Sequence, residues 1–159
     1  MNNRCEGFDK LKEECGVFGI YNNDDDQSGK ITYYGLFALQ HRGQESCGIA
    51  VTDDTVVKQY KDMGLVPEVF NAEILDKLTG KIAVGHVRYS TAGGSLRQNS
   101  QPLVSRYLKG ALTISHNGNL INAMDIREEF ENEGFIFQTT IDSEVIAYLI
   151  ARERVKHNS

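Results

Sequence analysis

The order of strand-like and helix-like segments constrains the fold of this chain more than any other feature. Short apolar runs bounded by turn residues predict strands, and longer segments with apolar residues at helical spacing predict helices. We predict strands over 15–21, 47–52, 55–60, 81–91 and 111–116, and helices over 31–40, 67–80, 119–134 and 142–154. Because this order contains no βαβ repeat, the chain is expected to form an α+β or layered α/β domain.

The size and charge of the chain narrow its class. Its 159 residues suffice for one compact domain, and 40% hydrophobic with 25% charged residues is a globular composition. The 17 Lys and Arg against 22 Asp and Glu give a net charge of −5, which argues against nucleic acid or a membrane as partner. Because the sequence contains neither a membrane span nor an apolar signal segment, we expect a cytoplasmic protein.

The most unusual cysteine, Cys15, lies where a charged leader, residues 1–14, meets the apolar run CGVFGIY. Considered alone, a cysteine at the start of a strand is better explained as a small buried residue. A nucleophilic thiol needs a base, and none of the four histidines is adjacent in sequence. Cleavage between Glu14 and Cys15 would create an α-amine with a pKa of about 7.7–8.0, which can take the thiol proton directly or through water.

Polar motifs at the ends of other predicted elements support the nucleophile jointly. They are LQHRGQES (39–46), GHVRYSTAGG (85–94), SHNGN (115–119) and TTIDSE (139–144). Together with ECGVFGI, they resemble the N-terminal-nucleophile, or class II, glutamine amidotransferases from about Glu13 to Tyr148. Within that class, QHRGQES, GHVRYSTAGG and HNGNL are similar to the amidophosphoribosyltransferase family. The alternative is the glutaminase domain of another class II enzyme, such as glucosamine-6-phosphate synthase.

The resemblance implies a fold and a domain organisation. The fold would be a four-layer α/β/β/α sandwich of antiparallel sheets, the N-terminal nucleophile hydrolase fold, with an incomplete second sheet. Residues 1–14 are expected to be a propeptide-like leader, which would be discarded together with Cys5. Residues 15–159 are expected to be a glutaminase domain truncated at its C-terminus. Ile141 departs from the family, which more often has a small polar residue before Asp142.

The resemblance also assigns the catalytic roles. Cys15 would attack the side-chain amide of L-glutamine, giving a γ-glutamyl thioester and ammonia. Asn117 and the Gly118 backbone N–H would stabilise the oxyanion of the tetrahedral intermediate. Asn-Gly is alternatively a type I′ hairpin turn, but a helical pattern follows it where a partner strand would be needed.

Substrate-binding roles follow from the same resemblance. Arg88 would bind the α-carboxylate of glutamine bidentately, although the sequence alone favours a structural ion pair for it. Asp142 would bind the α-ammonium group and is also placed to cap the last helix. Tyr89 and Thr91 would begin a lid over the substrate, which continues through the loop AGGSLRQNSQP (92–102). Arg42 would organise the pocket.

The resemblance implies that the full-length family enzyme has a second domain and cofactors outside this chain. Ammonia would pass to phosphoribosylpyrophosphate in an absent transferase domain, forming 5-phosphoribosylamine in the first committed step of purine synthesis. Mg²⁺ and, in the propeptide-bearing branch of the family, a 4Fe–4S cluster would be bound outside this chain. The full-length enzyme is expected to be a homo-oligomer. No metal site is expected on the four histidines, which lack ligand spacing. In the unprocessed state, the chain is alternatively an inactive amino-acid-binding module.

Overall fold

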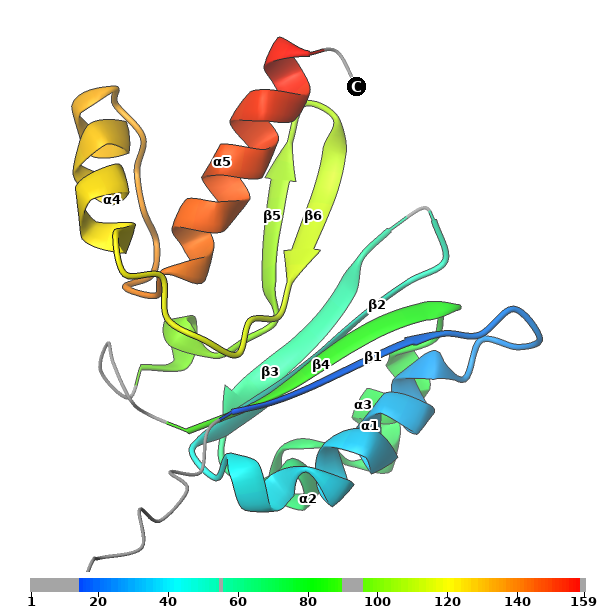
Figure 1. The fold of residues 1–159 in the computed structure, drawn as a ribbon. Helices are drawn as coiled ribbons and strands as arrows, with labels where there is room; N and C mark the ends of the chain where they lie inside the picture. Colours follow the sequence, from blue (N-terminus) through cyan, green and yellow to red (C-terminus); the bar gives the residue numbers. More distant parts are fainter. Residues whose placement is uncertain (1–14, 55, 90–95, 158–159) are drawn as a thin grey trace, which may run out of the picture.

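The computed structural model describes residues 15–54, 56–89 and 96–157, and Figure 1 shows how they are arranged. A four-stranded antiparallel sheet has the order β1-β4-β2-β3, and β5 and β6 form a separate antiparallel pair. The strands are β1 (Gly16–Tyr21), β2 (Ser46–Thr52), β3 (Lys58–Met63), β4 (Ile82–Arg88), β5 (Leu103–Tyr107) and β6 (Gly110–Ile114). The helices are α1 (Ser28–Ala38), α2 (Val66–Val69), α3 (Ala72–Lys77), α4 (Ala123–Asn132) and α5 (Ser143–Lys156), with 3₁₀ turns η1 (Gln40–Arg42) and η2 (Arg97–Asn99).

The elements lie in layers. Helices α1, α2 and α3 cover one face of the four-stranded sheet, whereas the β5–β6 pair, α4 and α5 lie on the other side (Figure 1). The predicted class, helices combined with antiparallel sheets, is confirmed. The strand predicted over 81–91 becomes β4, which pairs with both β1 and β2 and is therefore central.

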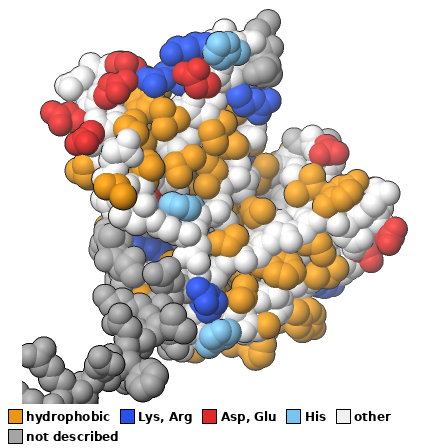
Figure 2. Space-filling model, viewed as in Figure 1, with side chains coloured by type: hydrophobic (Ala, Val, Ile, Leu, Met, Phe, Trp, Pro, Cys, Tyr) orange, Lys and Arg blue, Asp and Glu red, His pale blue; other side chains and the backbone are white. Residues whose placement is uncertain are grey.

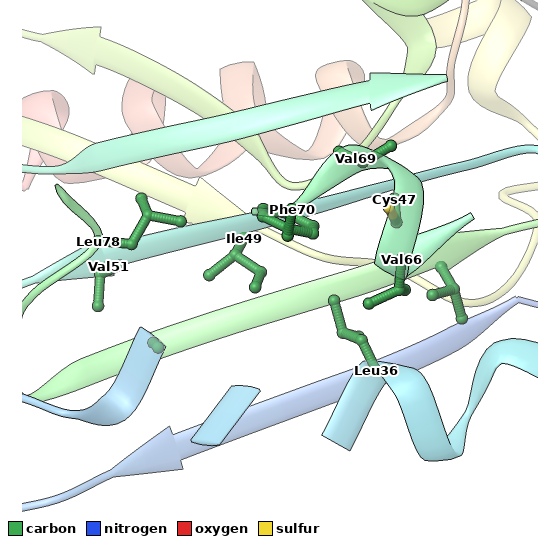
Figure 3. Close-up of a cluster of buried hydrophobic side chains, with 10 residues drawn as sticks. Leu36, Cys47, Ile49, Val51, Val66, Val69, Phe70 and Leu78 are labelled. Atoms are coloured by element: carbon green, nitrogen blue, oxygen red, sulfur yellow. The ribbon is translucent and has the colours of Figure 1, made fainter. Parts of the chain in front are cut away.

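The main core lies between the four-stranded sheet and helices α1 to α3. Alternate residues of β2 point into it, and Figure 3 shows these side chains packed against those of α1 and α2. The buried cluster contains Leu36, Cys47, Ile49, Val51, Val66, Val69, Phe70, Leu78, Ala83 and Val87. Cys47 lies on the strand predicted over 47–52, and its side chain is fully buried. Burial, and secondarily the nearby carboxylates of Asp62 and Glu68, raises the pKa of its thiol to about 12.

Helix α1 packs on the sheet through small residues. Its buried residues are Ser28, Gly29, Thr32 and Leu36. A Cβ atom added to Gly85 of β4 would lie 2.5 Å from the Thr32 methyl carbon, so the glycine permits this close approach. By contrast, the apolar residues Ile31, Tyr34 and Phe37 of the predicted stripe are exposed. The helix is confirmed, but its apolar stripe is not the side that packs.

Two predicted segments differ from the structure. The helix predicted over 67–80 is two helices, because Asn71 is extended and its side-chain oxygen accepts a hydrogen bond from the Ile74 N–H at 2.9 Å. Strand β5 was not predicted. In the expected lid, residues 90–95 lie outside the described residues, but Asn99, Ser100 and Gln101 are buried and belong to the packed structure.

Figure 2, in the same view as Figure 1, shows exposed hydrophobic side chains both over α4 and α5 and over the four-stranded sheet. None of the helices within the described ranges is long and apolar enough to cross a membrane.

Candidate active site

Cys15 lines a cavity whose other lining residues come mostly from the end of β4 and from the segments around α4 and α5. Gly16 pairs with Val87, so the preceding residue comes beside the end of β4. The Tyr89 N–H donates to Cys15 Sγ at 3.3 Å, and the thiol lies 3.5 Å from the Tyr89 carbonyl oxygen. The cavity measures about 410 Å³ and is lined by Cys15 and Tyr89 among others.

Two predicted site residues contact the backbone of Cys15. Asn117 Nδ2 donates to the Cys15 carbonyl oxygen at 2.7 Å, and Arg42 Nε donates to the same oxygen at 3.3 Å. Arg42 belongs to η1, which comes close to β4 because Gly43 has no side chain: a Cβ there would lie 2.7 Å from the Arg88 carbonyl carbon. The structure therefore brings together three residues that are far apart in the sequence.

Arg88 forms a buried ion pair. Its Nη1 lies 2.7 Å from Glu45 Oε1, and the side chains are 5% and 13% exposed. The pairing of β2 with β4 places Ser46 opposite Arg88, which brings Glu45 to the strand end. The ion pair favoured by the sequence alone is thus present, and Arg88 also lines the cavity. A buried guanidinium without such a partner would be costly.

Asp142 occupies the N-cap position of α5, as predicted, but its side chain makes no capping hydrogen bond. Its Oδ2 instead accepts a hydrogen bond from the Leu120 N–H at 2.7 Å, and its Oδ1 lies 3.6 Å from His116 Nδ1. Because Leu120 follows the Asn-Gly motif closely, this bond ties the start of α5 to the motif. The Asp142 carboxylate lines the same cavity as Cys15 and Arg88.

The Asn117–Gly118 motif is not a hairpin turn. Helix α4 follows β6 and the motif, and Gly118 is not among the glycines with positive φ that a type I′ turn requires. Gly118 lines the cavity, and a Cβ on it would lie 2.7 Å from His116 Nε2.

Several residues near the site were missed by the sequence analysis. Glu45 belongs to the quoted QHRGQES motif, but only the β2–β4 register reveals its pairing with Arg88. Gln101 and His116 also line the cavity. His116 belongs to the quoted SHNGN motif but was given no role, and no local pattern marks Gln101. Thr91 lies outside the described residues. Among the residues that the structure does describe, no group of three or more His, Cys, Asp or Glu side chains could hold a metal ion.

The chain is similar in sequence to known proteins. A family model described as a glutamine amidotransferase domain matches residues 86–158. The amidophosphoribosyltransferase of Bacillus subtilis (strain 168) is 52% identical over 143 residues, covering 89% of this chain and 30% of that protein. The amidophosphoribosyltransferase of Lacticaseibacillus casei is 48% identical over 144 residues, covering 90% of this chain and 73% of that protein.

Solved structures give the same result. A structure of glutamine phosphoribosylpyrophosphate amidotransferase from B. subtilis, in complex with ADP and GMP, superposes with a TM-score of 0.77 at 48% identity. Another, described as the allosteric regulatory enzyme of purine biosynthesis, gives a TM-score of 0.79 at 50% identity. Each match covers 86% of this chain and 29% of the solved chain. The chain thus spans about 30% of the length of the B. subtilis relative.

Proposed function

This chain belongs to the amidophosphoribosyltransferase family, and on that premise we propose that it performs the glutaminase half-reaction of such an enzyme. The observation that carries the proposal is a single cavity lined by a thiol, a guanidinium and a carboxylate, those of Cys15, Arg88 and Asp142. A free amino acid presents one carboxylate and one ammonium group, so these two charged side chains are complementary to its ends.

The reaction begins at the thiol. Cys15 Sγ, after losing its proton, attacks the side-chain amide carbon of glutamine and forms a tetrahedral intermediate. When the C–N bond breaks, the nitrogen leaves with an added proton as ammonia, and a γ-glutamyl thioester remains. Water then attacks the thioester, which releases glutamate and restores the thiol.

The base is the α-amine of Cys15, formed when the Glu14–Cys15 bond is cut. An α-amine with a pKa of about 7.7–8.0 is partly neutral near neutral pH and lies within reach of its own thiol. Residues 1–14 act as the propeptide in this proposal. In the uncut chain, this nitrogen is a peptide amide and cannot serve as the base.

The oxyanion is stabilised by Asn117 and Gly118. An amide nitrogen carries two hydrogens, and the 2.7 Å bond to the Cys15 carbonyl uses one of them. The other is close to the reacting centre because Asn117 already contacts the nucleophilic residue. The Gly118 N–H, from a residue that lines the cavity, provides the second donor.

Arg88 and Asp142 bind the two ends of glutamine. The Glu45 carboxylate fixes the guanidinium at one edge, and the substrate carboxylate meets Arg88 from the cavity. The Leu120 N–H fixes Oδ2 of Asp142, and Ser143 Oγ lies 3.4 Å from Oδ1. A carboxylate oxygen can accept two hydrogen bonds, so Oδ1 can also accept one from an ammonium group. Tyr89 and Thr91 close over the substrate, and Arg42 fixes the Cys15 backbone.

The remaining parts of the proposal concern the longer enzyme. Ammonia passes to phosphoribosylpyrophosphate and gives 5-phosphoribosylamine. Mg²⁺ and, in the propeptide-bearing branch of the family, an iron–sulfur cluster belong to regions outside this chain. The layers in Figure 1 support the four-layer N-terminal nucleophile hydrolase fold, in which β5 and β6 belong to the second sheet. Homo-oligomer formation is part of the same proposal.

The test measures glutamate release by the full chain, with its cleavage state established by intact mass. We expect glutamate only from material that begins at Cys15, and none from Cys15→Ser. Cys47→Ala is the control, because its thiol is buried away from the cavity and should leave turnover unchanged. Turnover by uncut chain, or by Cys15→Ser, would contradict the proposal.

A further inference from the structure

The backbone of His116, the residue directly before Asn117, is held on both its polar groups by one side chain. Gln101 Oε1 accepts a hydrogen bond from the His116 N–H at 2.7 Å, and Gln101 Nε2 donates to the His116 carbonyl oxygen at 3.3 Å. Gln101 is only 6% exposed. Its amide therefore fixes the orientation of the backbone that leads into the oxyanion motif.

A second buried side chain reaches the same carbonyl. His86, on the central strand β4, is fully buried, and its Nε2 lies 3.2 Å from the His116 carbonyl oxygen. Burial lowers the pKa of His86 to about 4, so the ring is neutral near pH 7. A neutral ring next to a carbonyl must carry its proton on Nε2, which makes His86 a donor. Its Nδ1 is buried without a hydrogen-bond partner among the described residues, which lowers the stability of the folded state.

The residues on either side of Gln101 are hydrogen-bonded to side chains of β3 in the four-stranded sheet. Lys61 Nζ, on β3, donates to the Ser100 carbonyl oxygen at 2.6 Å, and Gln59 Nε2, on the same strand, donates to the Pro102 carbonyl oxygen. The residues on both sides of Gln101 are thus bound to a strand. Through Gln101, the Asn117–Gly118 segment is therefore held in a fixed position relative to the four-stranded sheet. Cys15 directly precedes β1 of the same sheet.

We propose that Gln101 and His86 are positioning residues that aim the Asn117 and Gly118 donors at the reacting centre. The inference rests on the proposed function, because it assigns a purpose to the geometry of that site. Neither residue touches the substrate in this role. Both act through the His116 peptide, and a donor displaced by about 1 Å can cost 10²-fold in rate.

A purely structural role is the competing explanation. β6 ends at Ile114, so the His116 N–H and carbonyl have no strand partner and need hydrogen bonds wherever they are buried. Both explanations predict lower stability when Gln101 is replaced. Only the positioning role predicts that kcat falls while KM for glutamine stays nearly constant, because the oxyanion exists in the transition state and not in bound glutamine.

The decisive variant is Gln101→Met in the full chain after cleavage at Glu14–Cys15. We expect kcat for glutamine hydrolysis to fall about 10- to 100-fold, with KM changed less than about threefold. Gln101→Glu keeps an acceptor for the 2.7 Å bond and should lose less. The matched control is Lys58→Met, which removes two hydrogen bonds to Thr79 at the opposite end of the sheet and should leave kcat unchanged. If kcat in Gln101→Met equals that in Lys58→Met, the inference is overturned.

Amide hydrogen exchange gives a readout that needs no activity. Gln101→Met should accelerate exchange at the amides of His116, Asn117 and Gly118 by at least about tenfold relative to Lys58→Met. Should the cleaved wild-type chain release no glutamate, the proposed function fails, and hydrogen exchange then decides whether Gln101 positions this segment. Unchanged exchange at all three amides would overturn the positioning role even if the chain is an active glutaminase.

Discussion

Replacing Arg88 tests two roles of one side chain, the ion pair that is observed and the binding of glutamine that we propose. Arg88 and Glu45 are both buried, with 2.7 Å between Nη1 and Oε1, and Glu45 Oε2 has no hydrogen-bond partner among the described residues. Arg88→Met would therefore leave a buried carboxylate without its ion-pair partner. Removing one member of a buried pair costs about 3–5 kcal/mol, so we expect the free energy of unfolding to fall by that amount.

The double variant Arg88→Met with Glu45→Leu separates stability from substrate binding. Replacing both charges by apolar groups removes the unpaired carboxylate, so most of the lost stability should return. The hydrogen bonds to the substrate carboxylate do not return. Losing charge-assisted bonds of about 1.5–3 kcal/mol predicts that KM for glutamine stays raised about 10- to 100-fold in both variants.

Urea unfolding and glutaminase kinetics on the same preparations measure both effects. A loss below about 1 kcal/mol in Arg88→Met would refute the energetic reasoning about the buried pair. Recovery of the wild-type KM in the double variant would show that Arg88 acts only through Glu45 and does not bind glutamine.

Two further predictions concern the oxyanion motif and the buried histidine. Asn117→Ala should lower kcat by about 10²–10³ with little change in KM, and steady-state kinetics in which both change equally would contradict its role. Burial lowers the pKa of His86 from 6.5 to about 4, so between these values the unfolded chain binds a proton that the folded chain does not. The free energy of unfolding should thus fall by about 3 kcal/mol from this group as the pH drops from about 7 to about 4. His86→Leu should lose that much less over the same range in urea unfolding, and equal losses in both chains would refute the assignment.

Much of the secondary structure follows from the sequence because periodicity and turn residues are local. β1, β2, β4 and α5 are predicted nearly to their observed ends. α1 shows where this reasoning stops. Apart from Leu36, its buried residues are small or polar, so hydrophobicity identifies the helix but indicates the wrong packing face.

The missed elements have specific causes. The helix predicted over 67–80 is interrupted at Asn71, which caps α3 with its side chain. The apolar pattern continues across Asn71, so the pattern alone predicts one helix. β5 is short and joins β6 through Leu108 and Lys109, which lack the Asn-Gly signal of a hairpin turn. The sequence signal for this turn is Gly110 alone, and in the structure this glycine has a φ of +122°.

Some residues of the candidate site could be predicted from the sequence, and others could not. Cys15, Asn117 and Asp142 stand in recognisable motifs. In the structure Cys15 and Asp142 line one cavity, and Asn117 donates a hydrogen bond to Cys15. Glu45 and Gln101 could not be inferred because their roles depend on strand register and on contacts between distant segments. Such contacts are tertiary, and no sequence window contains both partners.

The central claim is that Cys15 becomes a nucleophile when it becomes the first residue. Labelling with a glutamine analogue that carries a diazo-ketone, followed by peptide mass mapping, tests this most directly on cut and uncut chain. The account predicts covalent label on Cys15 in cut chain only, and none on Cys47, whose pKa is raised to about 12 by burial. Label on Cys47 in folded protein, or equal labelling of Cys15 in uncut chain, would contradict it.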